Sequence, residues 1–232
     1  HIARVAGKRT GVISTVGTVI GDVREKSAHT TPESPDLQHL LARMRDARCD
    51  VVAMEVSSHA LDLERTFGSQ FAVTAFSNLT QDHLDYHHTF EAYFEAKARL
   101  FGKDYPARRV ICIDDKWGKE LLRRCSEAGD NVITTGFDRS AQIHPKDVAY
   151  YPTHTSVTLN VRGSYYEFDY PLEGKFNVEN IMCAFAIGLQ LGFPVQTVID
   201  ALREAPQIPG RLERIHTPHD GGVSVFVDYA HT

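Results

Sequence analysis

The chain has 232 residues, 42% hydrophobic and 24% charged, which is enough for one large domain or for one domain and part of a second. Its formal net charge of -5, without a basic block, argues against a general binder of nucleic acid or anionic membranes. No apolar run approaches the roughly 18 residues that a membrane-spanning helix needs. Residues 1–8 contain neither a secretory signal pattern nor an initiator methionine, so we expect that this N-terminus is not the native one.

Strand-like and helix-like segments alternate over the first 135 residues. We expect strands at 10–15, 50–55, 71–76, 109–114 and 131–135, and helices at 36–48, 89–101 and 116–128. The segment 50–55 is almost continuously apolar, as in a parallel strand buried on both faces. Thr89 can cap the helix that follows it. This alternation predicts an α/β fold with a mostly parallel, doubly wound sheet.

The pattern changes in the second half of the chain. Residues 156–161 and 165–170 alternate with a period of two around Gly163-Ser164, which predicts an antiparallel hairpin appended to the sheet. Helices are expected at 178–191 and 195–205, then a linker at 204–210, then strands at 211–215 and 223–227. We therefore divide the chain into a first domain at 1–207 and the start of another at 208–232, and we expect it to be cut at both ends.

The four cysteines show no paired short spacing, and each lies in an apolar or amphipathic segment. They are Cys49, Cys112, Cys125 and Cys183. This usage favours reduced, buried thiols over disulfides or a zinc site, and it predicts a cytoplasmic location.

Polar side chains gather where two of the expected strands end. Glu55 ends the apolar segment 50–55, and a carboxylate at such a position can hold Mg²⁺ beside a nucleotide phosphate. The alternative is an ordinary surface carboxylate. Residues 82–87, Asp-His-Leu-Asp-Tyr-His, could converge on a metal if the segment is extended, because alternate residues then share a face. Alternatively, the two acids cap a turn and the histidines are partly exposed.

Lys97 has an unexpected position on its helix. It lies in the apolar stripe, three residues after Phe94 and four before Phe101. A lysine there either extends its amine to water or has a partner that justifies burial. The nearby 82–87 tract strengthens the second alternative.

Three other segments could contact a ligand. Thr30-Thr31-Pro32 precedes the helix expected from 36, where it could bind an anion or simply cap the helix. Ser57 lacks the Gly-x-Ser-x-Gly surroundings of a nucleophile, so we expect it to hydrogen-bond a substrate. Asn177 and Asn180 lie one turn apart near a helix start, where they could cap the helix or contact an adenine edge.

Together these segments resemble the Mur ligases. Within that family they are most similar to the UDP-N-acetylmuramoyl-tripeptide synthetases, which add the third residue of the peptidoglycan stem peptide. The matching motifs occur in family order over nearly the whole chain: Thr30-Thr31-Pro32, 54–61 (MEVSSHAL), 78–87 (NLTQDHLDYH), 95–97 (EAK), 174–180 (GKFNVEN), 209–213 (PGRLE) and 227–232 (VDYAHT).

The resemblance implies a Mur ligase central domain in a monomeric, ATP-dependent amide ligase that forms an acyl phosphate from UDP-MurNAc-dipeptide and then joins an amino acid to it. It implies that Glu55 and His83 ligate Mg²⁺ and that Lys97, carbamylated by CO₂, supports the metal. These three would be the catalytic residues. The remaining implied contacts are Thr30, Thr31, Ser57 and Arg65 for the dipeptide substrate, and Asn180, Arg211 and Asp228 for ATP.

Three departures limit this transfer. Compared with the family, we expect the N-terminal uridine-binding domain and most of the C-terminal domain to be missing from these residues. No Gly-x-x-x-x-Gly-Lys-[Ser/Thr] phosphate loop is present, so we expect the gene to encode one just upstream of His1 and the chain alone to be inactive. Leu63 stands where some relatives have a polar substrate contact. The third amino acid, diaminopimelate or lysine, is not determined by these residues.

Three alternatives to this function remain at the level of sequence. The first is a ligase similar to folylpolyglutamate synthetase. The second is a metal-dependent hydrolase that uses Asp82, His83, Asp85 and His87. The third is a non-catalytic domain descended from a ligase.

Overall fold

The computed structural model describes residues 1–215 and 225–229. The helices are α1 (Ile2–Val5), α2 (Ser34–Asp46), α3 (Ser58–Asp62), α4 (Leu84–His87), α5 (Phe90–Ala98), the 3₁₀ helix η1 (Arg99–Phe101), α6 (Lys116–Glu127), α7 (Lys175–Gln190) and α8 (Val195–Arg203). The strands are β1 (Thr10–Ser14), β2 (Gly17–Ile20), β3 (Val23–Glu25), β4 (Val51–Met54), β5 (Val73–Phe76), β6 (Arg108–Cys112), β7 (Val132–Thr135), β8 (Ile143–Tyr150), β9 (Thr155–Val161), β10 (Ser164–Tyr170), β11 (Glu213–Ile215) and β12 (Val225–Val227).

The strands are divided among separate sheets. One has the order β3-β2-β1-β4, a larger one has the order β10-β9-β8-β7-β6-β5, and β11 pairs with β12. β1 pairs with β4 in parallel, as do β5, β6, β7 and β8 in succession, whereas β8, β9 and β10 are antiparallel. The predicted α/β class and the appended antiparallel segment are confirmed, with the parallel strands shared between two sheets.

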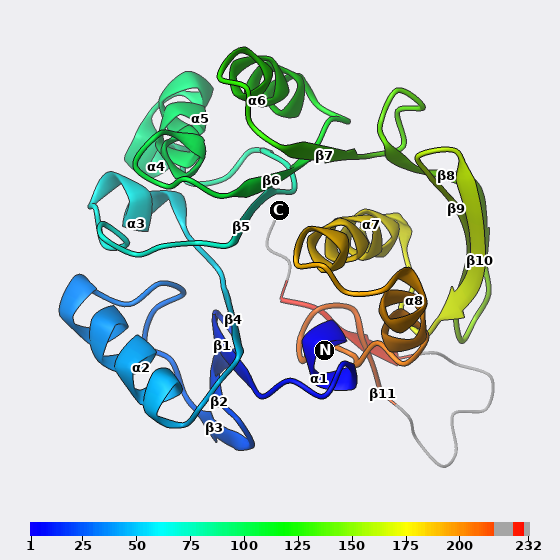
Figure 1. Ribbon diagram of the computed structural model, residues 1–232, viewed down its shortest axis with the longest axis horizontal. Coiled ribbons are helices and arrows are strands. Elements are labelled where there is room, and N and C mark those ends of the chain that lie inside the picture. The colour runs from blue at the N-terminus through cyan, green and yellow to red at the C-terminus, as the bar shows by residue number, and fades with distance from the viewer. Residues whose placement is uncertain (216–224, 230–232) are drawn as a thin grey trace.

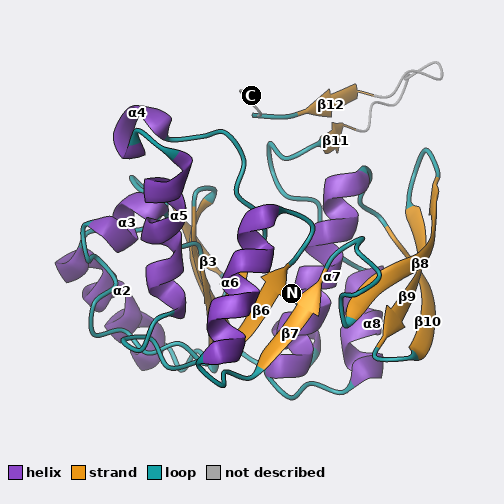
Figure 2. Cartoon of the chain, turned by 90° about the horizontal axis from the view of Figure 1, so that it is seen from above, coloured by secondary structure: helices purple, strands orange, loops and turns teal. Residues whose placement is uncertain are grey.

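Helices cover both faces of the larger sheet. Figure 1 shows α7 and α8 inside the arc of β5 to β10, and α5 and α6 on its outer side. α7 and α8 bury residues such as Met182, Phe185 and Val198 against the strands, forming the largest apolar cluster. In Figure 2, β6 and β7 point toward the side on which α4 and the β11–β12 pair lie. That side is therefore the carboxyl edge of the parallel strands, where α/β sheets bind ligands.

The helix expected at 89–101 forms because its sequence satisfies both its cap and its buried face. The Thr89 hydroxyl accepts a hydrogen bond from the Ala92 amide at 3.1 Å, and Tyr93 and Phe94 are buried. The last turn tightens into η1, which buries Leu100 and Phe101.

The expected hairpin is also present. β9 buries alternate residues and pairs with β10 in the register Val161 to Ser164. The connecting residues Arg162 and Gly163 both have positive φ, as a tight hairpin turn requires.

Two expectations about strands were wrong or incomplete. β4 is the edge strand of its sheet, and its residues Val52 and Ala53 are exposed. It is therefore not buried on both faces. β2 and β3 were not anticipated. The expected strands near 211–215 and 223–227 correspond to β11 and β12, whereas Val223 and residues 230–232 of the last motif lie outside the described residues.

All four cysteines are free, and Cys112 and Cys125 are buried as expected, whereas Cys49 and Cys183 are only partly buried. Among the described residues, no helix has the length and apolar character needed to cross a membrane.

Candidate active site

A pocket of about 260 Å³ lies at the carboxyl ends of β4 and β5, against α5 and η1. Its lining residues are Met54, Glu55, Val56, Leu61, Ala75, Phe76, Ser77, Asn78, Lys97, Leu100 and Phe101. Glu55 comes from the smaller sheet and Lys97 from a helix on the larger one. The structure therefore brings together two of the three residues expected to act in catalysis.

Glu55 is held by the end of the neighbouring strand. Its Oε2 accepts hydrogen bonds from the Thr15 amide at 2.8 Å and from the Thr15 hydroxyl at 2.6 Å. Both of these side-chain bonds from described residues use Oε2, so Oε1 can still serve as a hard oxygen ligand. Sequence reasoning missed Thr15, although its position directly after β1 was a signal that its hydroxyl would lie at the ligand edge.

The loop that carries Thr30 and Thr31 is fastened to the segment after β4. The Thr31 hydroxyl donates to the Glu55 carbonyl at 2.9 Å and accepts from the Ser57 amide at 3.0 Å. The Thr30 hydroxyl forms a hydrogen bond with the Thr15 hydroxyl, with 3.1 Å between the two oxygens. Thr31 is 1% exposed, and its hydroxyl is hydrogen-bonded to the backbone on both sides of Val56. In the structure it therefore positions Glu55 and Ser57.

Arg65, which follows α3 in the chain, contacts the same loop. Its guanidinium donates to the Thr31 carbonyl at 3.1 Å and pairs with Glu33 at 2.5 Å. The Ser57 hydroxyl caps α3 by accepting from the Ala60 amide at 3.2 Å. Thr31, Ser57 and Arg65 are thus neighbours, whereas their contact with a substrate remains a prediction. Leu63 is 53% exposed nearby in the chain.

Lys97 is mostly removed from water. Among the described residues no carboxylate lies within 4.0 Å of its amine, which instead lies over the Tyr93 ring, 5.1 Å from the centroid. Burial lowers the pKa of Lys97, and the charge of Asp82 only partly opposes this shift. The expectation that this lysine does not simply extend to water is consistent with these surroundings.

His83 lies beside this pocket within a group of aromatic rings. Its ring contacts Tyr93, with 6.0 Å between centroids, and His59, with 4.8 Å. Its Nε2 lies 3.4 Å from the Asp82 carboxylate. Tyr93 therefore touches both His83 and Lys97, although His83 does not itself line the pocket.

The expectation that residues 82–87 could be extended and converge on a metal is wrong. His83 has a left-handed φ of 54° and its carbonyl accepts from the Tyr86 and His87 amides, so 84–87 form α4. His87 turns inward, where it bonds the Ser58 hydroxyl at 2.9 Å. Within the described part of the chain, no three His, Cys, Asp or Glu side chains are grouped to hold a metal. The hydrolase alternative loses its geometric basis.

The residues expected to contact ATP lie on two other elements. Asn180, on α7, donates to the Asn177 side chain at 3.2 Å, and Asn177 donates to the Glu173 carbonyl at 2.7 Å. Arg211 and Asp228 are exposed, and they are neighbours because the Tyr229 amide donates to the Gly210 carbonyl at 2.9 Å. A role for these three in nucleotide binding remains a prediction.

The chain matches the Mur ligase middle domain family over residues 1–188. UDP-N-acetylmuramoyl-L-alanyl-D-glutamate–2,6-diaminopimelate ligases are among its relatives. That of Thermosynechococcus vestitus is 38% identical over 233 residues, and that of Synechococcus elongatus is 40% identical over 233 residues. Each alignment covers all of this chain and 46% of the relative. The chain therefore spans about half the length of these curated relatives.

Solved structures agree with the sequence relatives. A ligase structure of the same description aligns with a TM-score of 0.83 at 30% identity, covering 93% of this chain and 45% of the other. An FPGS–AMPPCP complex aligns with a TM-score of 0.70 at 16% identity, covering all of this chain and 64% of the other, which shows a common fold alone. From the family match and these relatives, we conclude that the chain belongs to the Mur ligase middle domain family.

Proposed function

We propose that this chain forms the central part of an ATP-dependent ligase that joins 2,6-diaminopimelate to UDP-N-acetylmuramoyl-L-alanyl-D-glutamate in peptidoglycan biosynthesis. The observation that carries the proposal is that Glu55 and Lys97 line one pocket at the carboxyl ends of β4 and β5. The names of relatives that are 38% and 40% identical support the choice of substrates. The proposal keeps the cytoplasmic location expected from the cysteines and the monomeric state that the family resemblance implies.

The residues at the pocket fit Mg²⁺ if Lys97 is carbamylated. In that reaction the ammonium first loses one proton, and the neutral amine then attacks the carbon of CO₂. A C–N bond forms as one C–O π bond opens, and a second proton is lost from nitrogen, so a cation becomes a carboxylate-like anion. Burial favours the neutral amine that this step needs. Glu55 would then supply one oxygen, His83 a ring nitrogen beside the pocket, and Lys97 further oxygens. When bound, Mg²⁺ would neutralise charge on the transferred phosphoryl group.

The remaining residues would hold the two substrates in line. An oxygen of the dipeptide carboxylate attacks the γ-phosphorus, the bond to the bridging oxygen breaks, and ADP leaves. The incoming amine then attacks the acyl carbon, phosphate departs, and the amine loses a proton. Thr30, Ser57 and Arg65 would orient the dipeptide, with Thr31 keeping their loop in place, while Asn180, Arg211 and Asp228 would hold ATP.

We also propose the division of the chain at residue 207 that the sequence predicts. Arg211 precedes β11 and Asp228 follows β12, whereas Asn180 lies on α7. ATP would therefore bind between residues of the two parts, 1–207 and 208–232.

The test begins with ¹³C-bicarbonate and the chain itself. We expect a carbamate ¹³C resonance that is absent from Lys97→Met but retained in Lys119→Met, because Lys119 is exposed and paired with Asp138 at 2.9 Å. In the longer gene product, continued ADP release over many turnovers should require both the UDP-linked dipeptide and diaminopimelate. Continued turnover without the amino acid, or with the dipeptide replaced by a folate, would contradict the proposed function.

A further inference from the structure

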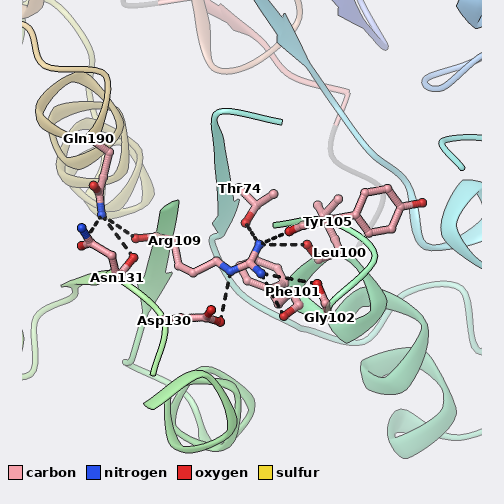
Figure 3. A network of polar contacts seen from close by, with 9 residues as sticks. All are labelled: Thr74, Leu100, Phe101, Gly102, Tyr105, Arg109, Asp130, Asn131 and Gln190. Carbon is pink, nitrogen blue, oxygen red and sulfur yellow. Dashed lines mark hydrogen bonds and ion pairs between the residues drawn. The ribbon is translucent and has the colours of Figure 1, made fainter. Parts of the chain in front are cut away.

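Arg109 is the largest side chain that is almost completely buried, with 2% of its surface exposed. It lies near the start of β6. Figure 3 shows its guanidinium surrounded by oxygen atoms from several segments. Neither the sequence motifs nor the proposed reaction gives this residue a role.

The guanidinium donates to β5 and to η1 at once. Nη1 donates to the Thr74 hydroxyl of β5 at 3.0 Å, and Nη2 donates to the Phe101 carbonyl of η1 at 3.2 Å. Nε lies 3.3 Å from the Asp130 carboxylate. The other acceptors are backbone carbonyls around the end of η1: Leu100 at 3.4 Å, Gly102 at 3.5 Å and Tyr105 at 2.8 Å.

These acceptors are directly joined to the residues that line the pocket. Leu100 and Phe101 line it themselves, and Thr74 immediately precedes Ala75, which also does. Lys97 lies one turn before the carbonyls that Arg109 contacts. One guanidinium therefore connects the β5 wall to the helix end that carries Lys97.

We propose that Arg109 is a positioning residue for Lys97, fixing the end of α5–η1 against β5 so that the amine stays in the pocket with Glu55. The residue would act through hydrogen bonds to the wall and would not touch the substrate. The importance of this position for catalysis rests on the proposed function, whereas the geometric effect does not.

The chemistry of the side chain explains why an arginine is needed. The last carbonyls of a helix have no partners within it, and a buried end must find donors elsewhere. A guanidinium offers five N–H donors in a fixed plane, so it can satisfy several carbonyls and a hydroxyl together. A lysine carries all its donors on one nitrogen, so it could not hydrogen-bond to β5 and to the end of η1 together. Burying a cation is costly unless it is fully hydrogen-bonded, which suggests that this geometry is specific.

The same residue also connects β6 to α7. The Arg109 carbonyl accepts a hydrogen bond from the Gln190 side chain at 3.1 Å, and Gln190 ends the helix on which Asn180 lies. Figure 3 shows the two halves of this network on opposite sides of Arg109. The start of β6 is thereby joined to both helices that carry candidate site residues.

The test compares Arg109→Gln, Arg109→Lys and Thr74→Val with the unaltered chain, without ATP or substrate. The first readout is the NMR shift of the Lys97 ε-methylene protons, which the Tyr93 ring should move upfield. The second is hydrogen exchange at the Gly102 amide, which bonds the Arg99 carbonyl at 3.0 Å. Both Arg109 variants should lose most of the ring-induced shift and exchange Gly102 about tenfold faster or more. Thr74→Val should lose part of the shift.

Leu159→Ala is the matched control, because Leu159 is a fully buried core residue of β9 in a different apolar cluster from Phe101. It should lower the unfolding temperature without changing either readout. If Arg109→Gln does not fold, Arg109→Lys and Thr74→Val decide the matter. The proposal is wrong if the folded variants keep the Lys97 shift and the Gly102 protection seen in Leu159→Ala. Since neither readout involves turnover, its result is independent of whether the ligase assay succeeds.

Discussion

Lys97 shows how the surroundings of one side chain can prepare it for chemistry. Its amine lies over the Tyr93 ring beside the pocket that Glu55 also lines, and burial lowers its pKa. Burial of this kind disfavours the charged form, so it is a cost to the fold unless another gain offsets it. The proposed carbamate would be that gain, because it converts the amine into a metal ligand.

Replacing Lys97 by methionine should therefore separate stability from activity. Lys97→Met removes the amine and keeps much of the volume, so the unfolding temperature should stay the same or rise. Ligase turnover of the longer protein should fall by about 10²-fold or more, as when one group that stabilises transition-state charge is removed. Calorimetry and an ADP-release assay measure the two effects, and Lys119→Met should change neither strongly. Full activity in Lys97→Met would refute the catalytic role.

His87 should make stability depend on pH. Burial and then the neighbouring His59 lower its pKa below 6.5, so the unfolded state binds a proton more readily than the folded state. Its contribution is therefore fully present above about pH 6.5 and is lost as the pH falls toward the lowered folded value. The urea midpoint should be lower at about pH 5.5 than at about pH 7.5.

His87→Phe keeps an aromatic ring against Tyr93 but cannot be protonated, so the difference between the two midpoints should shrink. His59 also has a pKa lowered by burial, so part of the difference should persist. His39→Gln, on the exposed part of α2, serves as the control and should keep the full difference. An unchanged pH dependence in His87→Phe would show that His87 is not responsible.

At the scale of elements, α5 is the segment that determines where Lys97 lies. Its beginning is capped by Thr89 and its end, through η1, is contacted by Arg109. A short helix with both ends fixed places its side chains reproducibly, which is what a positioned ligand requires.

Loss of the cap should destabilise the whole domain modestly. Thr89→Ala removes the acceptor for the Ala92 amide and should lower the free energy of unfolding by about 1 kcal/mol. Thr89→Ser keeps the hydroxyl and should recover most of that loss. Urea unfolding measures both variants. Equal stability of Thr89→Ala and the unaltered chain would mean that the cap contributes nothing.

Sequence reasoning predicted the elements whose determinants are local. The α5 helix has its cap and apolar stripe within one segment, and the β9–β10 hairpin has its turn at Gly163. The conformation of 84–87 depends instead on His87, which packs on Tyr93 and bonds Ser58, a residue 29 positions away in the sequence. Such contacts leave no periodic signal, so α4 could not be read from the pattern.

The residues of the candidate site were likewise predictable from the sequence only in part. Glu55 at a strand end and the anomalous Lys97 were each noticed from the sequence, and the family resemblance placed them in one site. The structure shows both lining one pocket. Arg109 gave no signal, because two arginines at the start of a strand look like an ordinary exposed edge. Only the positions of Thr74 and η1 show that one of them is buried.

At the scale of the whole molecule, the β11–β12 pair is joined by an ion pair to the segment just before α7. Arg214 of β11 lies 3.2 Å from Glu173, just before α7, with side chains 16% and 25% exposed. Arg214 also donates to the Pro152 carbonyl. These contacts determine how residues near Arg211 sit relative to α7.

Glu173→Gln should loosen this connection. With the charge removed, hydrogen exchange and tryptic cleavage around Arg211 and Arg214 should become faster, while the core of α7 stays protected. Glu167→Gln is a suitable control, because Glu167 is an exposed residue of β10. Unchanged cleavage in Glu173→Gln would show that the ion pair does not hold the β11–β12 pair in place.

The pocket has a further consequence because its two sides belong to different sheets. β4 and β5 are not neighbours in any hydrogen-bonded sheet of the described residues, so no strand pairing sets the gap between Glu55 and Lys97. A cation held from both sides would act as a cross-link between the two sheets. Its binding free energy would then be added to the resistance of the domain to unfolding, as for any ligand that binds the folded state alone. Binding of the cation and stabilisation of the fold would therefore occur together.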